Sequence, residues 1–198
     1  MTRPYETWWA SLRHGGLLIA PSRLEETFPE DVPALPLHLQ DRLRRELNAF
    51  RDDPQGQLGA LLDTVLEEIL GHEPEQWLKA SAVPASWGKR LVTGDNEKPR
   101  RLWLEPHGSV LPVFTTQEPR LGVGRGRRAA ARIVEWLRRS SQKLALLTNG
   151  RQWRLIHAGP DYEAWCEWDT DLWFEQGQPG PQLLALRLLL TEIGRAHV

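Results

Sequence analysis

Residues 143–157 read Lys-Leu-Ala-Leu-Leu-Thr-Asn-Gly-Arg-Gln-Trp-Arg-Leu-Ile-His, and this stretch decides the fold. Two runs rich in apolar residues flank Asn149-Gly150, a strong signal for a tight hairpin because both central residues must accept positive φ. The first run, residues 144–147, is continuously apolar, as expected for a strand buried on both faces. The second run alternates and places Trp153 and Leu155 on one side of a strand. The stretch therefore predicts a β-hairpin whose first strand is central in a sheet.

A helix is predicted immediately before the hairpin, over residues 127–141. Apolar residues recur there at helical spacing and define one buried face: Ala130, Ile133, Val134 and Leu137. Three short strands are predicted further upstream, at residues 89–93, 101–105 and 110–115. Pro112 lies inside the third and has no N–H to donate, so we expect that strand at a sheet edge or at a bulge.

The first part of the chain has helical periodicity instead. Two amphipathic helices are predicted, at residues 37–51 and 57–70, and the second ends at Gly71. A helical portion at 1–54, followed by a module of strands and helices at 55–176, predicts an α+β protein with a mixed sheet and flanking helices.

The composition is that of a globular chain without a membrane-spanning segment. Of the 198 residues, 40% are hydrophobic and 26% are charged, and no apolar run approaches the roughly 20 residues that cross a bilayer. A single cysteine, Cys166, excludes an internal disulfide and a cysteine-based zinc cage. We therefore expect a cytoplasmic protein with no membrane partner. Most of its ten tryptophans are expected in the core.

The formal net charge of −1 hides a strong asymmetry. Residues 120–154 contain ten Lys/Arg and one acid, Glu135, so this block carries about +9 while the remaining residues sum to about −10. Residues 161–175 contain six acids and no Lys or Arg. A basic block of this kind indicates either a nucleic-acid surface or pairing with an acidic segment.

The hairpin sequence also carries a resemblance. Residues 147–150, Leu-Thr-Asn-Gly, followed by Trp153, resemble the LLTNG-x-x-W-x-L segment of large restriction–modification and phage-defence DNA adenine methyltransferases, of type II G-like and DISARM- or BREX-like kinds. In those proteins the segment closes an N-terminal nuclease-like module that precedes the methyltransferase domain. The resemblance covers roughly residues 55–192 and includes the final apolar helix. Other residues that carry it are Trp165, Trp168, Trp173 and Phe174.

The resemblance implies a restriction-endonuclease-like fold of the PD-(D/E)xK type, whose core has the same order of helix, three strands, helix and two strands. It also implies a parent protein that transfers a methyl group from S-adenosylmethionine to adenine N6. This chain has neither an Asn/Asp-Pro-Pro-Tyr/Phe motif nor a glycine-rich S-adenosylmethionine loop, so no cofactor is expected in it. The methyltransferase domain would lie downstream, after a linker and apolar helix at 177–191. Residues 192–198 read like a translated sequencing adapter and are expected to be non-native.

A working nuclease of this type needs carboxylates and a lysine on neighbouring strands to hold a divalent cation. The strand at 110–115 supplies neither, which predicts a degenerate nuclease fold without a catalytic or metal site. The nearest acids are weak candidates for a nuclease site, and acids in solvated loops would give the same pattern. They are Asp95, Glu105 and Glu118.

Residues 122–128, Gly-Val-Gly-Arg-Gly-Arg-Arg, form a glycine-rich turn ahead of a helix, where backbone N–H groups can meet a phosphate. The turn matches no nucleotide-binding motif. Arginines then recur along the helix, where like charges at i,i+4 cost stability and so indicate a partner. The candidate DNA-binding residues are Arg125, Arg127, Arg128, Arg132, Arg138 and Arg139.

Two origins of this arginine cluster stay open, a phosphate track on duplex DNA or pairing with the acids of residues 161–175. The first predicts a DNA-engaging or scaffolding module that also meets the downstream methyltransferase domain of the same chain. The second predicts a protein-interaction module without DNA contact. An active Mg²⁺-dependent DNA nuclease is the third alternative.

Overall fold

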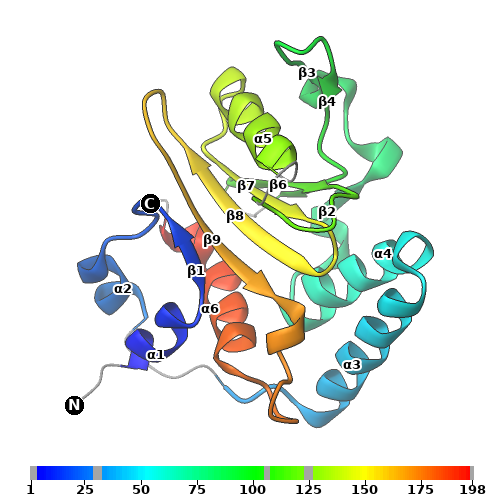
Figure 1. Cartoon of the computed structure of the whole chain (residues 1–198), viewed down its shortest axis with the longest axis vertical. Helices are drawn as coiled ribbons and strands as arrows, with labels where there is room; N and C mark the ends of the chain where they lie inside the picture. The colour runs from blue at the N-terminus through cyan, green and yellow to red at the C-terminus, as the bar shows by residue number, and fades with distance from the viewer. Residues whose placement is uncertain (1–3, 29–32, 105–107, 123–126, 197–198) are drawn as a thin grey trace. The chain divides into compact units, whose positions relative to one another are not determined.

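The structure is a computed structural model, and it describes most of the chain. The described residues are 4–28, 33–104, 108–122 and 127–196. They form an α+β protein with a mixed sheet, in agreement with the predicted fold class (Figure 1).

The chain divides into two compact units. Unit 1 contains residues 1–13, 19–74 and 168–198. Unit 2 contains residues 14–18 and 75–167. The chain thus passes between the two units several times. The expected boundaries at residues 54 and 176 would instead divide it into parts that are each continuous in sequence.

Unit 1 is helical. Its elements are α1 (Pro4–Ala10), α2 (Pro21–Thr27), α3 (Leu37–Asp52), α4 (Pro54–Asp63), the π-helix η1 (Thr64–Ile69), the 3-10 turn η6 (Thr170–Leu172) and α6 (Pro181–Ala196). Helix α3 confirms the amphipathic pattern at 37–51 and buries Leu43, Leu47 and Phe50. Asp53 separates α3 from α4, and its carboxylate accepts the Gly56 N–H at 3.0 Å, which caps α4.

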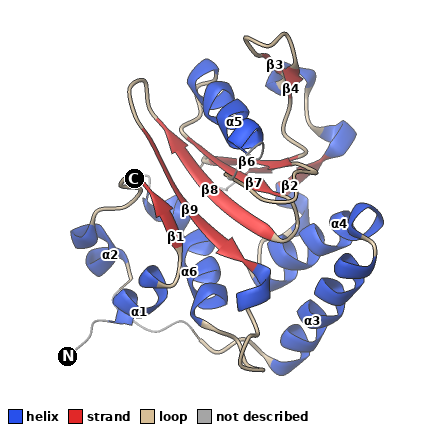
Figure 2. Ribbon diagram, viewed as in Figure 1, coloured by secondary structure: helices blue, strands red, loops and turns tan. Residues whose placement is uncertain are grey.

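The strands form one seven-stranded sheet in the order β1-β9-β8-β7-β6-β5-β2 (Figure 2). The strands are β1 (Arg13–Gly15), β2 (Trp77–Lys79), β5 (Arg101–Leu104), β6 (Val110–Thr115), β7 (Leu144–Thr148), β8 (Gln152–Ala158) and β9 (Glu163–Asp169). Strands β6 and β7 pair in parallel, while β2–β5, β5–β6 and β7–β8 are antiparallel pairs. The sheet is therefore mixed, as predicted.

The hairpin and helix expected at the centre of the fold are confirmed. Strand β7 is buried along its whole length and pairs with β8 in the register Leu146↔Leu155. Helix α5 (Arg127–Arg139) packs on β7 and β8 (Figure 1). This contact buries Trp136 and Ile133 in one cluster with Leu147.

Of the two positions expected for the strand that contains Pro112, a sheet edge or a bulge, the sheet edge is wrong. Strand β6 lies between β5 and β7, and Pro112 is opposite Leu102 of β5. The β6–β7 pairs begin only at Val113. The Val113 carbonyl accepts the Arg100 N–H, so it points towards β5. Neighbouring residues of a strand direct their backbone polar groups to opposite sides, so the Pro112 nitrogen points towards β7. At Pro112 the β6–β7 pairing has not yet begun.

A separate two-stranded hairpin lies beside α5 in unit 2 (Figure 1). It pairs β3 (Lys89–Arg90) with β4 (Asn96–Glu97), so the strand expected at 89–93 is shorter than predicted. Two short 3-10 turns, η3 (Ala80–Ala82) and η4 (Ala85–Trp87), lie in unit 2, and a third, η2 (Pro74–Gln76), begins at the last residue of unit 1 before it.

Most tryptophans are buried, as expected. The buried ones are Trp8, Trp77, Trp103, Trp136, Trp153, Trp168 and Trp173. Within the described residues, every helix is too short or too polar to cross a lipid bilayer.

Candidate nucleic-acid interface

The Asn149 side chain helps to hold the turn of the β7–β8 hairpin. Its Oδ1 accepts the backbone N–H groups of Arg151 (3.1 Å) and Gln152 (2.7 Å). Gly150 has a positive φ of 87° but Asn149 does not, so the expectation that both residues take positive φ is wrong for Asn149. The Asn149 Nδ2 donates to the Glu118 carbonyl oxygen at 2.9 Å. The turn therefore also fixes the segment that leads from β6 to α5.

Two β8 side chains hold the next part of that segment. The Gln152 Oε1 accepts the Leu121 N–H at 2.7 Å, and the Arg154 Nη2 donates to the Leu121 carbonyl oxygen at 3.2 Å. Both side chains are buried. The polar residues of the hairpin sequence thus position the end of the loop just before the glycine-rich stretch.

Arg154 belongs to a buried ion pair that sequence reasoning missed. Its Nε and Nη2 lie 2.8 and 2.5 Å from the same Glu167 oxygen, and the two side chains are 4% and 1% exposed. The guanidinium lies 3.9 Å from the Trp165 ring centroid. On Gly122, whose φ is +73°, an added Cβ would lie 2.5 Å from Nη2. The signal in the sequence was the acidic segment opposite a basic block, but it did not identify this pair.

Cys166 and His72 have side chains of the kind that can take part in catalysis when solvent reaches them, and both are buried. Burial, with the neighbouring Glu167 carboxylate, raises the pKa of the Cys166 thiol and disfavours the nucleophilic thiolate. In unit 1, His72 is 6% exposed, and burial lowers its pKa to about 4. The geometry gives both residues a structural role.

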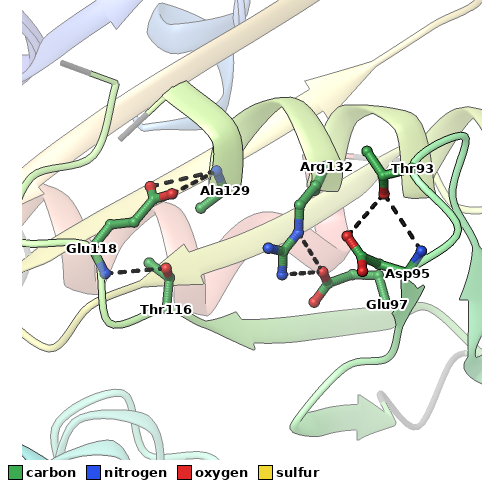
Figure 3. Close-up of polar contacts among 7 residues, drawn as sticks. All are labelled: Thr93, Asp95, Glu97, Thr116, Glu118, Ala129 and Arg132. Carbon is green, nitrogen blue, oxygen red and sulfur yellow. Dashed lines mark hydrogen bonds and ion pairs between the residues drawn. The ribbon is translucent and has the colours of Figure 1, made fainter. Parts of the chain in front are cut away.

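Glu118 occupies the N-terminus of α5. Its carboxylate oxygens lie 3.2 and 3.4 Å from the Ala129 nitrogen, and its own N–H bonds the Thr116 hydroxyl at 3.2 Å (Figure 3). A carboxylate here is favoured by the helix dipole and satisfies an N–H that a phosphate would otherwise take. The anion position at the start of α5 is therefore filled from within the protein. Residues 123–126 of the glycine-rich turn lie outside the described residues.

The two candidate nuclease acids that the structure describes, Asp95 and Glu118, have different partners. Asp95 lies in the turn between β3 and β4 and accepts the Thr93 hydroxyl at 2.9 Å. Figure 3 shows Asp95 and Glu118 engaged with different partners, on either side of Arg132. Glu105 lies outside the described residues. In the part of the chain that the structure describes, no three His, Cys, Asp or Glu side chains gather so that they could hold a metal ion.

Two of the candidate arginines on α5, Arg132 and Arg139, pair with acids outside residues 161–175. Arg132 donates Nε and Nη2 to Glu97 Oε2 at 2.8 and 2.5 Å (Figure 3). Arg139 donates Nε to Glu135 Oε1 at 2.8 Å. Glu97 lies in β4 and Glu135 in α5 itself, so neither acid belongs to the segment 161–175.

The remaining candidate arginines differ from one another. Arg138 does meet the acidic segment, because its Nη2 lies 3.7 Å from the Glu163 carboxylate, while its Nε donates to the Gly159 carbonyl oxygen at 3.1 Å. Arg128 is exposed, and among the described residues its side chain makes no ion pair or hydrogen bond. Arg125 and the side chain of Arg127 lie outside the described residues.

The two units differ sharply in charge. Unit 2 contains sixteen Lys/Arg and nine Asp/Glu, a formal net charge of +7. Unit 1 contains nine Lys/Arg and seventeen Asp/Glu, a formal net charge of −8. The charge asymmetry of the sequence thus corresponds to a positive unit 2 and a negative unit 1. The ion pairs within unit 2 do not remove its net positive charge.

Each unit also contains a cavity. The one in unit 2 has a volume of about 360 Å³ and lies beside α5, where Arg138 and Arg154 line it together with Glu135 and Glu163. The one in unit 1 has a volume of about 560 Å³ and is lined by Trp8 and Arg187, among others. Because the first cavity mixes equal numbers of cationic and anionic side chains, it does not select an anion.

A scan of protein-family models, a search of curated proteins and a search of solved structures each found no match for this chain.

Proposed function

We propose that unit 2 engages the phosphate backbone of duplex DNA. The observation that carries the proposal is the net charge of +7 on this unit, against −8 on unit 1. Lys and Arg contacts to phosphates dominate sequence-independent DNA affinity. Arg128, in the first turn of α5, and Arg120, just upstream, are both exposed and supply cations for such contacts.

We further propose a larger setting for this unit, on the resemblance of the hairpin sequence. The chain would be the N-terminal DNA-engaging or scaffolding module of an S-adenosylmethionine-dependent DNA adenine methyltransferase from a restriction–modification or phage-defence system. Apart from the separate β3–β4 hairpin, which lies between β2 and β5 in the chain, the order of helix, β2, β5, β6, α5, β7 and β8 supports a degenerate PD-(D/E)xK fold. Binding of S-adenosylmethionine and methyl transfer would belong to a downstream domain, which would also be a contact partner of this module.

A protein-interaction module without DNA contact is the second candidate. It is favoured by the internal ion pairs of Arg132, Arg138 and Arg139, which leave fewer cations for phosphates. The two candidates differ in one measurable property, since release of counterions from DNA makes phosphate binding depend steeply on salt.

Arg128→Gln is expected to weaken binding of the 198-residue chain to duplex DNA at every sequence tested. One lost phosphate contact should flatten the slope of log affinity against log salt by about 0.9. Fluorescence anisotropy of a labelled duplex, titrated with protein at several salt concentrations, measures the slope.

The matched control is Arg45→Gln, which removes an exposed arginine from α3 of unit 1. We expect this variant to keep the wild-type slope. Equal slopes for wild type and Arg128→Gln would contradict a phosphate contact at Arg128, and wild-type protein that does not bind DNA even at low salt would leave the protein-interaction module as the better account.

A further inference from the structure

One face of α5 carries a row of four charged side chains, three cationic and one anionic, that the β3–β4 hairpin contacts at two points. Arg128, Arg132, Glu135 and Arg139 follow one another at spacings of four, three and four residues, which places them on one stripe of the helix. Glu97 of β4 contacts Arg132. The Val92 N–H, in the hairpin turn, donates to Glu135 Oε1 at 2.6 Å.

The contact between Arg132 and Glu97 is that of a guanidinium with an oxyanion. Both Nε and Nη2 of Arg132 converge on one Glu97 oxygen (Figure 3). The Glu97 side chain is 13% exposed and that of Arg132 is 44% exposed, so the carboxylate lies inward and the cation outward. A phosphate oxygen would bind the same donor edge of the arginine in the same way.

We propose that Glu97 holds the place of a DNA phosphate on Arg132, so that the β3–β4 hairpin limits how strongly the α5 stripe binds DNA. This inference rests on the proposed function of unit 2. In the free protein, Arg128 is the cation of the stripe that is exposed and unpaired among the described residues. When the Glu97 charge is absent, Arg132 becomes a second phosphate contact next to Arg128, one helical turn away.

The physical basis is competition between two anions for one guanidinium. Ion pairs of partly exposed side chains contribute little to stability, so loss of the Glu97 charge leaves the fold intact. The backbone contact between Val92 and Glu135 is independent of Glu97 and keeps the hairpin on α5. A change at Glu97 therefore alters the charge presented by the stripe more than it alters the structure.

Glu97→Gln tests the inference in the full 198-residue chain with a labelled DNA duplex. We expect the slope of log affinity against log salt to steepen by about 0.9, because one phosphate contact is gained. The gain in affinity over wild type should grow about 3.5-fold when salt is lowered from roughly 200 to 50 mM, which is that slope applied to a fourfold change in salt. Glu97→Ala should behave alike and serves if the amide disturbs folding.

Two further variants isolate the role of Arg132. Glu75→Gln removes an exposed carboxylate of unit 2 that lies in η2, outside both α5 and the β3–β4 hairpin, and it should leave the slope unchanged. The double variant Glu97→Gln/Arg132→Gln should lose the gain. The inference is overturned if Glu97→Gln and Glu75→Gln behave alike, or if the double variant keeps the gain. If neither wild type nor any variant binds DNA, the proposed function itself fails and the inference fails with it.

Discussion

Glu167→Gln is expected to lower the free energy of unfolding by about 3–5 kcal/mol, the usual cost of leaving one partner of a buried ion pair without its counter-charge. Arg154 and Glu167 are both almost completely buried, and no water reaches the guanidinium to replace the carboxylate. The effect extends beyond the pair, because Arg154 also bonds the Leu121 carbonyl oxygen and lies on Trp165. We therefore expect a loss of order in the loop before α5 as well.

The control lies on the same strand. Glu163→Gln breaks the contact with Arg138 at 3.7 Å, but both side chains are about half exposed, so the expected loss is below about 1 kcal/mol. Replacing both buried partners, Arg154→Met with Glu167→Leu, should recover much of the stability lost in the single variant. Urea unfolding followed by tryptophan fluorescence measures all three. Equal stabilities for Glu167→Gln and Glu163→Gln would mean that the buried pair does not hold the unit together.

Acidification from pH 7 to pH 5 is expected to destabilise unit 1 by about 2 kcal/mol through His72 alone. Burial lowers the pKa of His72 from 6.5 to about 4. Between pH 6.5 and pH 4, the unfolded state therefore binds a proton that the folded state does not bind. The stabilisation is complete above pH 6.5 and is lost as the pH falls towards 4. The window between pH 7 and 5 keeps this effect apart from most carboxylates, which titrate at lower pH.

The measurement is the difference in unfolding free energy between the two pH values, so that any direct cost of a substitution cancels. His72→Gln should lose most of the dependence on pH in this window. His38→Gln, at an exposed position in α3, should keep the wild-type dependence. A wild-type chain equally stable at pH 7 and pH 5 would refute the buried, neutral state of His72.

The elements that the sequence predicted correctly have strong local patterns. The hairpin at β7–β8 follows from a continuous apolar run next to Asn149-Gly150, and α3 and α5 follow from apolar residues at helical spacing. Strands β1, β2, β3 and β4 were missed or placed too long because each has only two or three residues, too few to show alternation. Their positions depend on pairing with distant strands.

The candidate site was predicted less well, because its chemistry depends on partners far apart in the chain. The basic block was visible in the sequence, but Arg132 finds its acid in Glu97, and Arg154 finds Glu167. Glu118 looked like a solvated loop acid, yet its carboxylate accepts the N–H of Ala129, eleven residues later in the first turn of α5. Charge pattern alone does not identify such partners, since each is set by how the strands and α5 pack.

The most direct test of the central claim, that unit 2 meets DNA phosphates through its basic surface, is protection of individual arginines from an arginine-specific dicarbonyl reagent. Peptide mapping by mass spectrometry would compare the chain alone with the chain bound to duplex DNA. We expect slower modification of Arg128 and Arg120 when DNA is present, the original rates again at high salt, and no change at Arg45 of unit 1. Modification of Arg128 and Arg120 at the same rate with and without DNA, or protection of Arg45 instead, would contradict it.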